Sequence, residues 1–271
     1  MKEKLSIFSF YLKKRVVWAL VIMAAMAIYI TLAWLGCFKY NFEPDAAFRT
    51  NIFDFETIQV YLNHFLLLGF FIAIIVCILV CLDFQFGKSN TTYILRRLPV
   101  GEKNIYIGKA ISNFLMLMWV YLFTALLELA CLWGMYYVRD HQVFVVNLVG
   151  DIFDYDFMYM MFPLADPMIF VKNVATYLML AIFLMYGSFR LTYGHAPILG
   201  IVGSITSVIL LFWEVLGSRV LLLSDSWYKS SVILVFLINA AIIALVFVRL
   251  HHYFNGEYAD EDYIMQGGET C

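Results

Sequence analysis

The chain has 271 residues, of which 63% are hydrophobic and 14% are charged. An ordinary soluble domain is about 25% charged, so this composition excludes a soluble globular protein and predicts an integral membrane protein. The formal net charge of −2 conceals an uneven distribution of charge along the chain, and we expect the lipid bilayer, not a nucleic acid, to be a partner. Because the bilayer core offers no water to exposed backbone groups, apolar runs of about 20 residues must be helices.

The first 15 residues combine a polar side and an apolar side when they are placed on a helix. The polar side carries Lys2, Ser6, Ser9 and Lys13, and the apolar side carries Leu5, Phe8, Tyr11 and Leu12. Such a helix suits the inner membrane interface, so we expect an interfacial N-terminal helix. A cleaved signal peptide is the competing interpretation, because a basic start before an apolar run is its signature. The lack of a small-residue cleavage site favours an uncleaved helix.

Six apolar segments follow, and we interpret them as six transmembrane helices of a single transmembrane domain, residues 1–250. Their predicted bounds are about 16–38, 58–82, 111–137, 168–189, 198–215 and 231–248. The third is longer than a bilayer requires and is expected to tilt or to project beyond it. Between the last two, residues 216–230 contain an apolar run that is too short to span but can dip into the membrane. Residues 251–271 are expected to form a cytoplasmic tail.

The distribution of basic residues predicts the orientation of these spans. Loops rich in Lys and Arg stay on the cytoplasmic side, and placing both termini there puts 12 of the 18 basic residues inside, namely Lys2, Lys4, Lys13, Lys14, Arg15, Lys88, Arg96, Arg97, Lys103, Lys109, Arg190 and Arg249. The outer loop at residues 138–167 is acidic, and its local field would attract cations. We predict a multi-pass protein of the cell (plasma) membrane with both termini cytoplasmic.

The longest polar interruption between apolar segments is residues 82–110, and it is basic. It carries Lys88, Arg96, Arg97, Lys103 and Lys109 against Asp83 and Glu102. Residues 89–98 are predicted to form a short amphipathic helix, which Pro99 ends because proline has no backbone N–H to donate. A basic amphipathic helix lies on a membrane surface or docks onto a protein there.

The motifs predict no catalytic residue, metal or cofactor in this chain. The phosphate-loop pattern G-x-x-x-x-G-K-S/T would need glycine before the GKS of residues 87–89, and Leu82 stands at that position. The five histidines form no H-E-x-x-H pattern, and the cysteines within the spans are interpreted as small apolar packing residues. An intramembrane enzyme is therefore the least favoured class of function.

Two polar features lie inside the predicted spans. Four residues of the third span share one helical face at spacings of 8, 3 and 4, namely Asn113, Tyr121, Thr124 and Glu128. They either line a substrate pathway or bond to neighbouring helices, and the lone carboxylate is costly enough in a membrane to suggest function or a partner. In the fifth span, Gly200, Gly203, Ser204 and Ser207 predict a close helix contact.

The order of these parts resembles the ABC-2 type permeases, the membrane subunits of ATP-binding cassette exporters. The resemblance covers most of the chain, and its most telling local piece is YILRRLPVGEKNIYIGKAISNFL, residues 93–115. This piece is similar to the family's run in which a leucine-proline pair precedes a few polar residues and a lysine starts the third span. Leu98, Pro99 and Lys109 hold those positions here.

The resemblance implies a cytoplasmic ABC ATPase dimer, which binds ATP and Mg, and a second permease subunit, identical or homologous, with the substrate pathway formed between the two permeases by alternating access. The segment between spans 2 and 3 would be the cytoplasmic coupling helix, with an ATPase interface at Tyr93, Ile94, Arg96, Arg97, Leu98, Pro99, Glu102 and Lys103. The long acidic loop at residues 138–167 departs from the polysaccharide-exporting branch, which leaves the substrate class open. The competing function is a non-transporting sensor or assembly protein that docks a cytoplasmic partner through the same helix.

Overall fold

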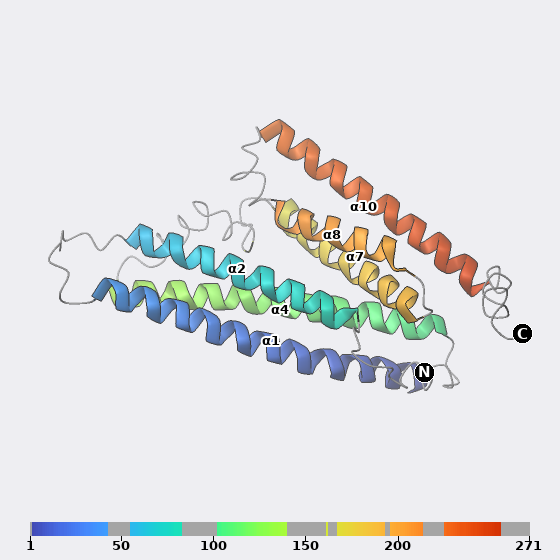
Figure 1. Ribbon diagram of the computed structural model, residues 1–271, viewed down its shortest axis with the longest axis horizontal. Coiled ribbons are helices and arrows are strands. Elements are labelled where there is room, and N and C mark those ends of the chain that lie inside the picture. The colour runs from blue at the N-terminus through green and yellow to red at the C-terminus, as the bar shows by residue number, and fades with distance from the viewer. Residues whose placement is uncertain are drawn as a thin grey trace, which may run out of the picture.

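The computed structural model describes residues 2–42, 55–82, 102–139, 161, 167–192, 196–213 and 225–255. Regular structure in these ranges is α-helical, as predicted. The helices are α1 (Lys2–Phe42), α2 (Phe55–Cys81), α4 (Glu102–Arg139), α7 (Pro167–Thr192), α8 (Ile198–Leu211) and α10 (Asp225–Phe254) (Figure 1).

Five of these helices are long and apolar enough to cross a membrane. The apolar stretches are Ser9–Ala33, His64–Cys81, Lys103–Cys131, Pro167–Leu191 and Lys229–Phe254. The prediction of a helical multi-pass membrane protein is therefore confirmed. Helix α8, which lies in the predicted fifth span, has 14 residues and is about 21 Å long at 1.5 Å per residue, short of a hydrocarbon core of about 30 Å. The complete six-span topology stays a prediction.

Helix α1 corrects one expectation. It runs for 41 residues without a break, so the predicted separate interfacial helix is instead the first turns of the same helix as the first span. Neither proline nor glycine occurs before Gly36, and sharp kinks in helices usually need such residues. Arg15, at the expected boundary, is buried in the bundle, so the chain has no reason to turn there.

Consecutive helices run in opposite directions. The start of α1 lies beside the end of α2, where Arg15 bonds to the Val80 carbonyl, and the start of α4 lies beside the end of α7, where Lys109 bonds to Ser188. The end of α10 also lies there, because Tyr253 packs on Phe189 of α7 with ring centroids 4.8 Å apart. Figure 1 shows α1 beginning and α10 ending on the same side of the molecule.

We call this side of the bundle the basic end. Nine of the thirteen described Lys and Arg residues lie in the helix halves nearer to it, namely Lys2, Lys4, Lys13, Lys14, Arg15, Lys103, Lys109, Arg190 and Arg249. The other four, Lys39, Arg139, Lys172 and Lys229, lie in the opposite halves. The opposite side of the bundle is called the far end below.

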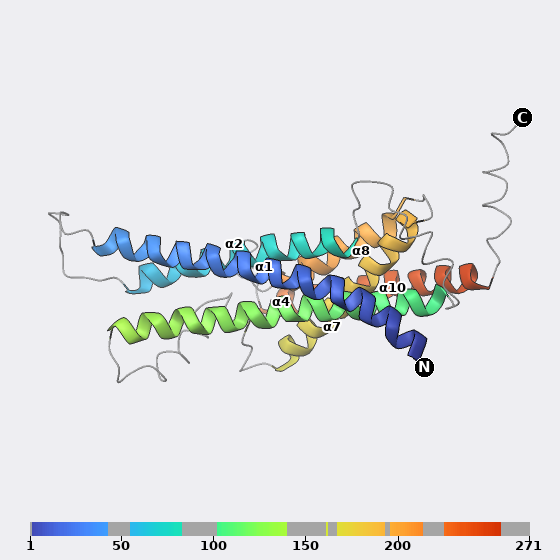
Figure 2. The same cartoon turned by 90° about the horizontal axis from the view of Figure 1, so that it is seen from below.

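The core has two parts. The larger lies among α1, α2, α4 and α7 and contains Ile30, Phe70, Leu117 and Leu184, and Figure 2 shows α1 extending alongside α2 and α4, the helices it packs on. The smaller lies between α7 and α10 and is centred on Phe189. Eight large apolar side chains of α10 are exposed, among them Leu234, Leu237 and Phe247, as expected for a helix that faces lipid.

The tightest helix contact joins α7 and α8. A Cβ atom at Gly200 would lie 2.8 Å from the Cα of Gly187, and one at Gly203 would lie 2.5 Å from the ring of Phe183. These distances leave no space for a side chain, so the two backbones approach closely. The predicted small-residue contact of Gly200, Gly203, Ser204 and Ser207 is confirmed, because all four are buried in α8.

Candidate functional site

The first candidate site is centred on Arg15, whose side chain is 1% exposed. Its Nε donates to Asn113 Oδ1 at 3.0 Å on α4. Its two terminal nitrogens donate to the Val80 and Cys81 carbonyls of α2, at 2.5 and 3.2 Å. The last carbonyls of a helix have no partners within the helix and carry the negative end of its dipole. One guanidinium therefore caps α2 and ties it to α1 and α4.

Lys109 makes a second connection one turn before Asn113 on α4. It is buried, and its Nζ donates to Ser188 Oγ on α7. The same Nζ lies 5.9 Å from the centre of the Tyr11 ring on α1, within the range of a cation–π interaction. Lys109 thus connects α4 to α1 and α7 at the basic end.

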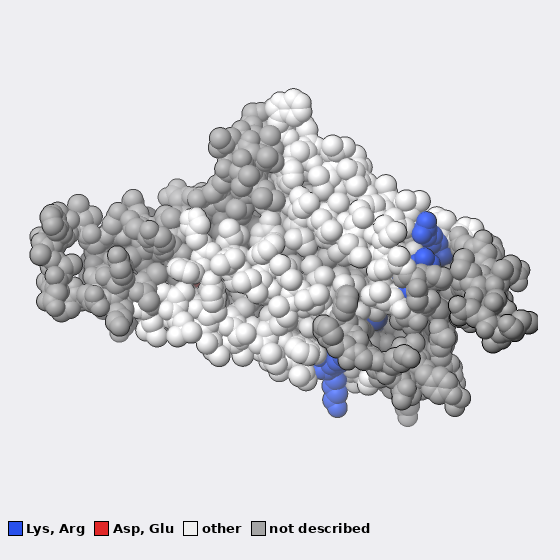
Figure 3. All heavy atoms as spheres, in the orientation of Figure 1, with Lys and Arg blue, Asp and Glu red and all other residues white. Residues whose placement is uncertain are grey.

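The Arg15 and Lys109 contacts lie on either side of the segment that contains the predicted ATPase interface. The chain leaves α2 at Leu82 and enters α4 at Glu102, and the predicted helix 89–98 between them lies outside the described residues. The same holds for Tyr93, Ile94, Arg96, Arg97, Leu98 and Pro99. Of the remaining interface residues, Glu102 and Lys103 begin α4, and Lys103 is exposed. Figure 3 shows a largely uncharged described surface, with blue Lys and Arg side chains gathered toward the basic end.

All four predicted pathway residues are buried in α4, namely Asn113, Tyr121, Thr124 and Glu128. Three of them bond within the bundle. Asn113 accepts from Arg15, the Tyr121 hydroxyl donates to the Met161 carbonyl at 2.9 Å, and Thr124 Oγ1 donates to the Val120 carbonyl at 2.8 Å. These bonds account for the Tyr121 and Thr124 hydroxyls and for the Asn113 oxygen, whereas Asn113 Nδ2 has no hydrogen-bond partner among the described residues.

Glu128 differs from the other three. It is 1% exposed, and neither carboxylate oxygen has a hydrogen-bond partner among the described residues. It lies one turn beyond Thr124, whose Oγ1 is 3.8 Å from Met26 Sδ on α1. A lone carboxylate inside a membrane is costly and marks a functional hypothesis by default. Within the described bundle, no contact explains its presence.

Helix α7 adds a second buried polar group in the same half of the bundle. The Tyr177 ring lies 5.4 Å from the Tyr121 ring, and the Tyr177 side chain is fully buried. Its hydroxyl has no hydrogen-bond partner in the described ranges. Because α4 and α7 are antiparallel, the residues of α7 before Tyr177 face the half of α4 that contains Glu128. We call Glu128 and Tyr177 the unsatisfied pair, without implying a contact between them.

Sequence reasoning missed three of these residues. Arg15 directly borders an apolar run, and the charge distribution places it with the other cytoplasmic basic residues. Its hydrogen bond to Asn113, 98 residues later in the chain, cannot be recognised from the sequence. Tyr177 follows Asn173 by four residues, so these two polar side chains share one face of a largely apolar helix. Lys172, within the fourth span, donates to the Leu210 carbonyl at 3.4 Å, near the end of α8, and so repeats on a smaller scale what Arg15 does for α2.

The described residues hold no group of three or more His, Cys, Asp or Glu that could bind a metal ion. The chain matches no protein-family model, and no curated protein or solved structure is significantly similar to it.

Proposed function

We propose that this chain is the membrane-spanning permease subunit of an ABC transporter, acting as an exporter. It forms the substrate pathway as a dimer with an identical or homologous permease and is driven by a separate ATPase dimer, which binds ATP and Mg. The observation that carries the proposal is the buried Arg15, which joins α1 and α4 to the end of α2. The basic segment that would contact the ATPase begins and ends on these joined helices.

The mechanical reason lies in how a force on residues 83–101 would spread. Both helices that flank the segment are bonded to one guanidinium, so a push on the segment would move them, together with α1, as a unit. Packed helices switch between discrete arrangements rather than deforming continuously. The Lys109 bond to Ser188 would pass the movement to α7, the helix that carries Tyr177 of the unsatisfied pair.

The charge distribution supports placing the basic end in the cytoplasm, where the ATPase and ATP are. Nine of the thirteen described Lys and Arg residues lie in the helix halves nearer to that end, and cytoplasmic segments are enriched in these residues. Under this orientation the unsatisfied pair lies in the outer half of the bundle. Both chain termini then face the cytoplasm.

The proposed substrate pathway follows α4 toward Glu128, along the face that also carries Asn113, Tyr121 and Thr124. A carboxylate without a partner is suited to bind a cationic group, because opposite charges attract strongly where water is excluded. In the bundle as described, the group is shut off from solvent. Alternating access would expose it when α4 and α7 separate.

Co-purification of the tagged chain from its native membrane in mild detergent tests the proposal. We expect mass spectrometry to identify a stoichiometric ATPase with a phosphate loop. The double variant Arg96→Glu with Arg97→Glu is expected to lose both the ATPase and transport, whereas Arg139→Glu, at the far end of α4, retains them. Intact ATPase binding in the double variant would refute the coupling segment, and a complex without any ATPase would refute the transporter.

The alternative is a non-transporting sensor or assembly protein. Asn113, Tyr121 and Thr124 form hydrogen bonds within the bundle. These bonds favour the alternative, because they stabilise a static bundle and leave the three side chains less available to a substrate. Under this alternative, the purified complex would contain a cytoplasmic kinase or scaffold protein in place of an ATPase. An intramembrane enzyme would instead show activity in the purified chain without any partner.

A further inference from the structure

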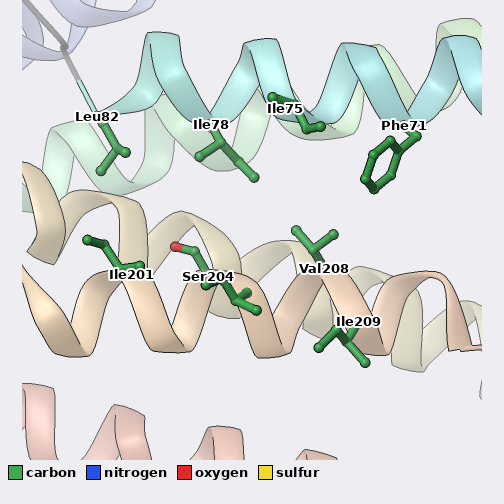
Figure 4. A pocket seen from close by; sticks show the side chains of 9 residues that line it. Phe71, Ile75, Ile78, Leu82, Ile201, Ser204, Val208 and Ile209 are labelled. Carbon is green, nitrogen blue, oxygen red and sulfur yellow. The ribbon is translucent and has the colours of Figure 1, made fainter.

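A groove of about 370 Å³ lies between α2 and α8. Figure 4 shows aliphatic side chains of the two helices facing each other across it, among them Ile75 and Ile78 from α2 and Val208 from α8. Ser204 is the one polar residue among the described residues that line it, and its hydroxyl donates to the Gly200 carbonyl within α8 at 2.7 Å. The groove therefore offers apolar contacts and no free donor.

The groove opens on the outside of the bundle and starts at the basic end. Phe71 and Ile205, on opposite walls, are 41% and 55% exposed, so the opening faces the surroundings of the helices. At the basic end, the Leu82 side chain packs against Gly187 of α7. Along α2, residues 71–82 extend about 16 Å at 1.5 Å per residue. One leaflet contributes about 15 Å to the hydrocarbon core, so the groove has the depth of one leaflet.

The dimensions favour an occupant narrower than a helix. A helix of the same length is a cylinder at least about 10 Å across, which corresponds to roughly 1,300 Å³. That volume is several times the groove, whereas an extended hydrocarbon chain is narrow enough to enter. An apolar groove left unfilled loses the dispersion contacts of its lining. A single acyl chain therefore matches the groove in length, volume and polarity.

The position of Arg190 on α7 places a cation at the same end of the bundle as Leu82, the groove residue nearest the basic end. Arg190 is in the last turn of α7, three residues after Gly187, so the two lie on neighbouring positions of the same helix side. A guanidinium binds phosphate through two parallel donors. The described surface at this end is also the more basic one, which favours a lipid with a net negative head group.

We propose that the groove between α2 and α8 binds one acyl chain of an anionic phospholipid from the leaflet at the basic end, with its phosphate beside Arg190. This leaflet is the cytoplasmic one under the proposed orientation. The lipid would fill the space between α2 and α8. It would also hold α8 in place, because α8 is too short to span the bilayer alone.

The test uses the full chain, purified in detergent and titrated with phosphatidylglycerol or with phosphatidylcholine of the same acyl chains. Native mass spectrometry counts the bound lipids. We expect one retained phosphatidylglycerol per chain, and Ile205→Trp, which fills the groove, is expected to weaken its retention about tenfold. Leu237→Trp is the matched control, since Leu237 is 60% exposed on α10, near the level at which Thr206 bonds to Asn239.

Arg190→Gln separates the head-group contact from the groove. It is expected to bring phosphatidylglycerol retention down to that of phosphatidylcholine, about tenfold, without lowering phosphatidylcholine retention. Equal retention of both lipids by the unaltered chain would refute the anionic preference. Unchanged retention in Ile205→Trp would refute the groove itself. A second copy as the occupant would appear as a dimer that Ile205→Trp disrupts. None of these failures would alter co-purification of an ATPase, so the two proposals are tested independently.

Discussion

Two pairs of buried polar residues in the bundle differ in their hydrogen bonds. At the basic end, the buried cations Arg15 and Lys109 bond to neighbouring helices. Toward the far end, the Glu128 carboxylate and the Tyr177 hydroxyl are as deeply buried, yet have no hydrogen-bond partner in the described part of the chain. Burial by itself therefore does not identify a functional residue in a membrane protein. The state of its hydrogen bonds separates a group that joins helices from one whose burial is not offset within the described bundle.

The difference has a physical origin. A guanidinium can reach three acceptors at once because its donors form a planar fork, and the end of α2 supplies carbonyls that would otherwise lack partners. The free-energy cost of burying Arg15 is thus offset by hydrogen bonds to carbonyls that would otherwise lack a donor. No hydrogen bond from the described residues offsets the burial of Glu128, and this is why we propose a step in which the site opens.

The largest effect is expected for Arg15→Met. This change leaves the Asn113 oxygen and two carbonyls without their donor, which is expected to lower the free energy of unfolding by about 3 kcal/mol. The midpoint of thermal unfolding in detergent measures the loss. Lys13→Met, an exposed change on the same helix, is the control and is expected to stay within about 0.5 kcal/mol. Equal midpoints for the two variants would show that Arg15 does not join the helices.

The next effect is expected for Gly200→Ala. Its new Cβ would lie 2.8 Å from the Cα of Gly187, and backbone atoms cannot move aside without separating α7 from α8. The expected loss is about 2 kcal/mol, despite the higher helix propensity of alanine. Val202→Ala, a change at an exposed position of α8, provides the comparison in the same unfolding assay. A more stable Gly200→Ala variant would contradict the close contact.

Lys172→Met is expected to have a smaller effect than Arg15→Met. Both residues donate to carbonyls near the end of a helix, but Lys172 reaches the Leu210 carbonyl at 3.4 Å, which is long for a hydrogen bond. We expect a loss of about 1 kcal/mol, measured against Lys229→Met at an exposed position of the same end. A loss as large as that of Arg15→Met would mean that the two ends are held together equally strongly.

The smallest effect on stability, and the largest on transport, is expected for Glu128→Gln. No hydrogen bond is lost, so the unfolding free energy should change by less than about 0.5 kcal/mol. Export of a cationic compound should fall at least about tenfold, measured as resistance of cells to a panel of cationic peptides and drugs. Thr124→Val, one turn away, should retain resistance because its hydroxyl bonds within α4. Unchanged resistance in Glu128→Gln would remove this residue from the pathway.

Much of the helical architecture follows from local sequence. The predicted spans 58–82, 111–137 and 168–189 lie on α2, α4 and α7 and differ from them by a few residues, except at the start of α4, which begins at Glu102. Apolar runs of bilayer length leave the backbone no alternative to a helix. The accumulation of Lys and Arg at one end also follows from the sequence. Successive helices alternate in direction, so basic residues at the start of α1 and α4 and at the end of α7 and α10 lie on the same side of the bundle.

Other features required the tertiary structure. The continuity of α1 through Arg15 was missed because a basic residue beside an apolar run normally marks a boundary, whereas here its partners lie 65 to 98 residues away. The unsatisfied Tyr177 was equally invisible, since its burial depends on a neighbour from another helix. The sequence by itself determined which residues are helical and where charge accumulates, because these depend on nearby residues and bilayer thickness. The fold alone decided which buried polar groups have partners, because hydrogen bonds between helices depend on packing across long separations in the chain.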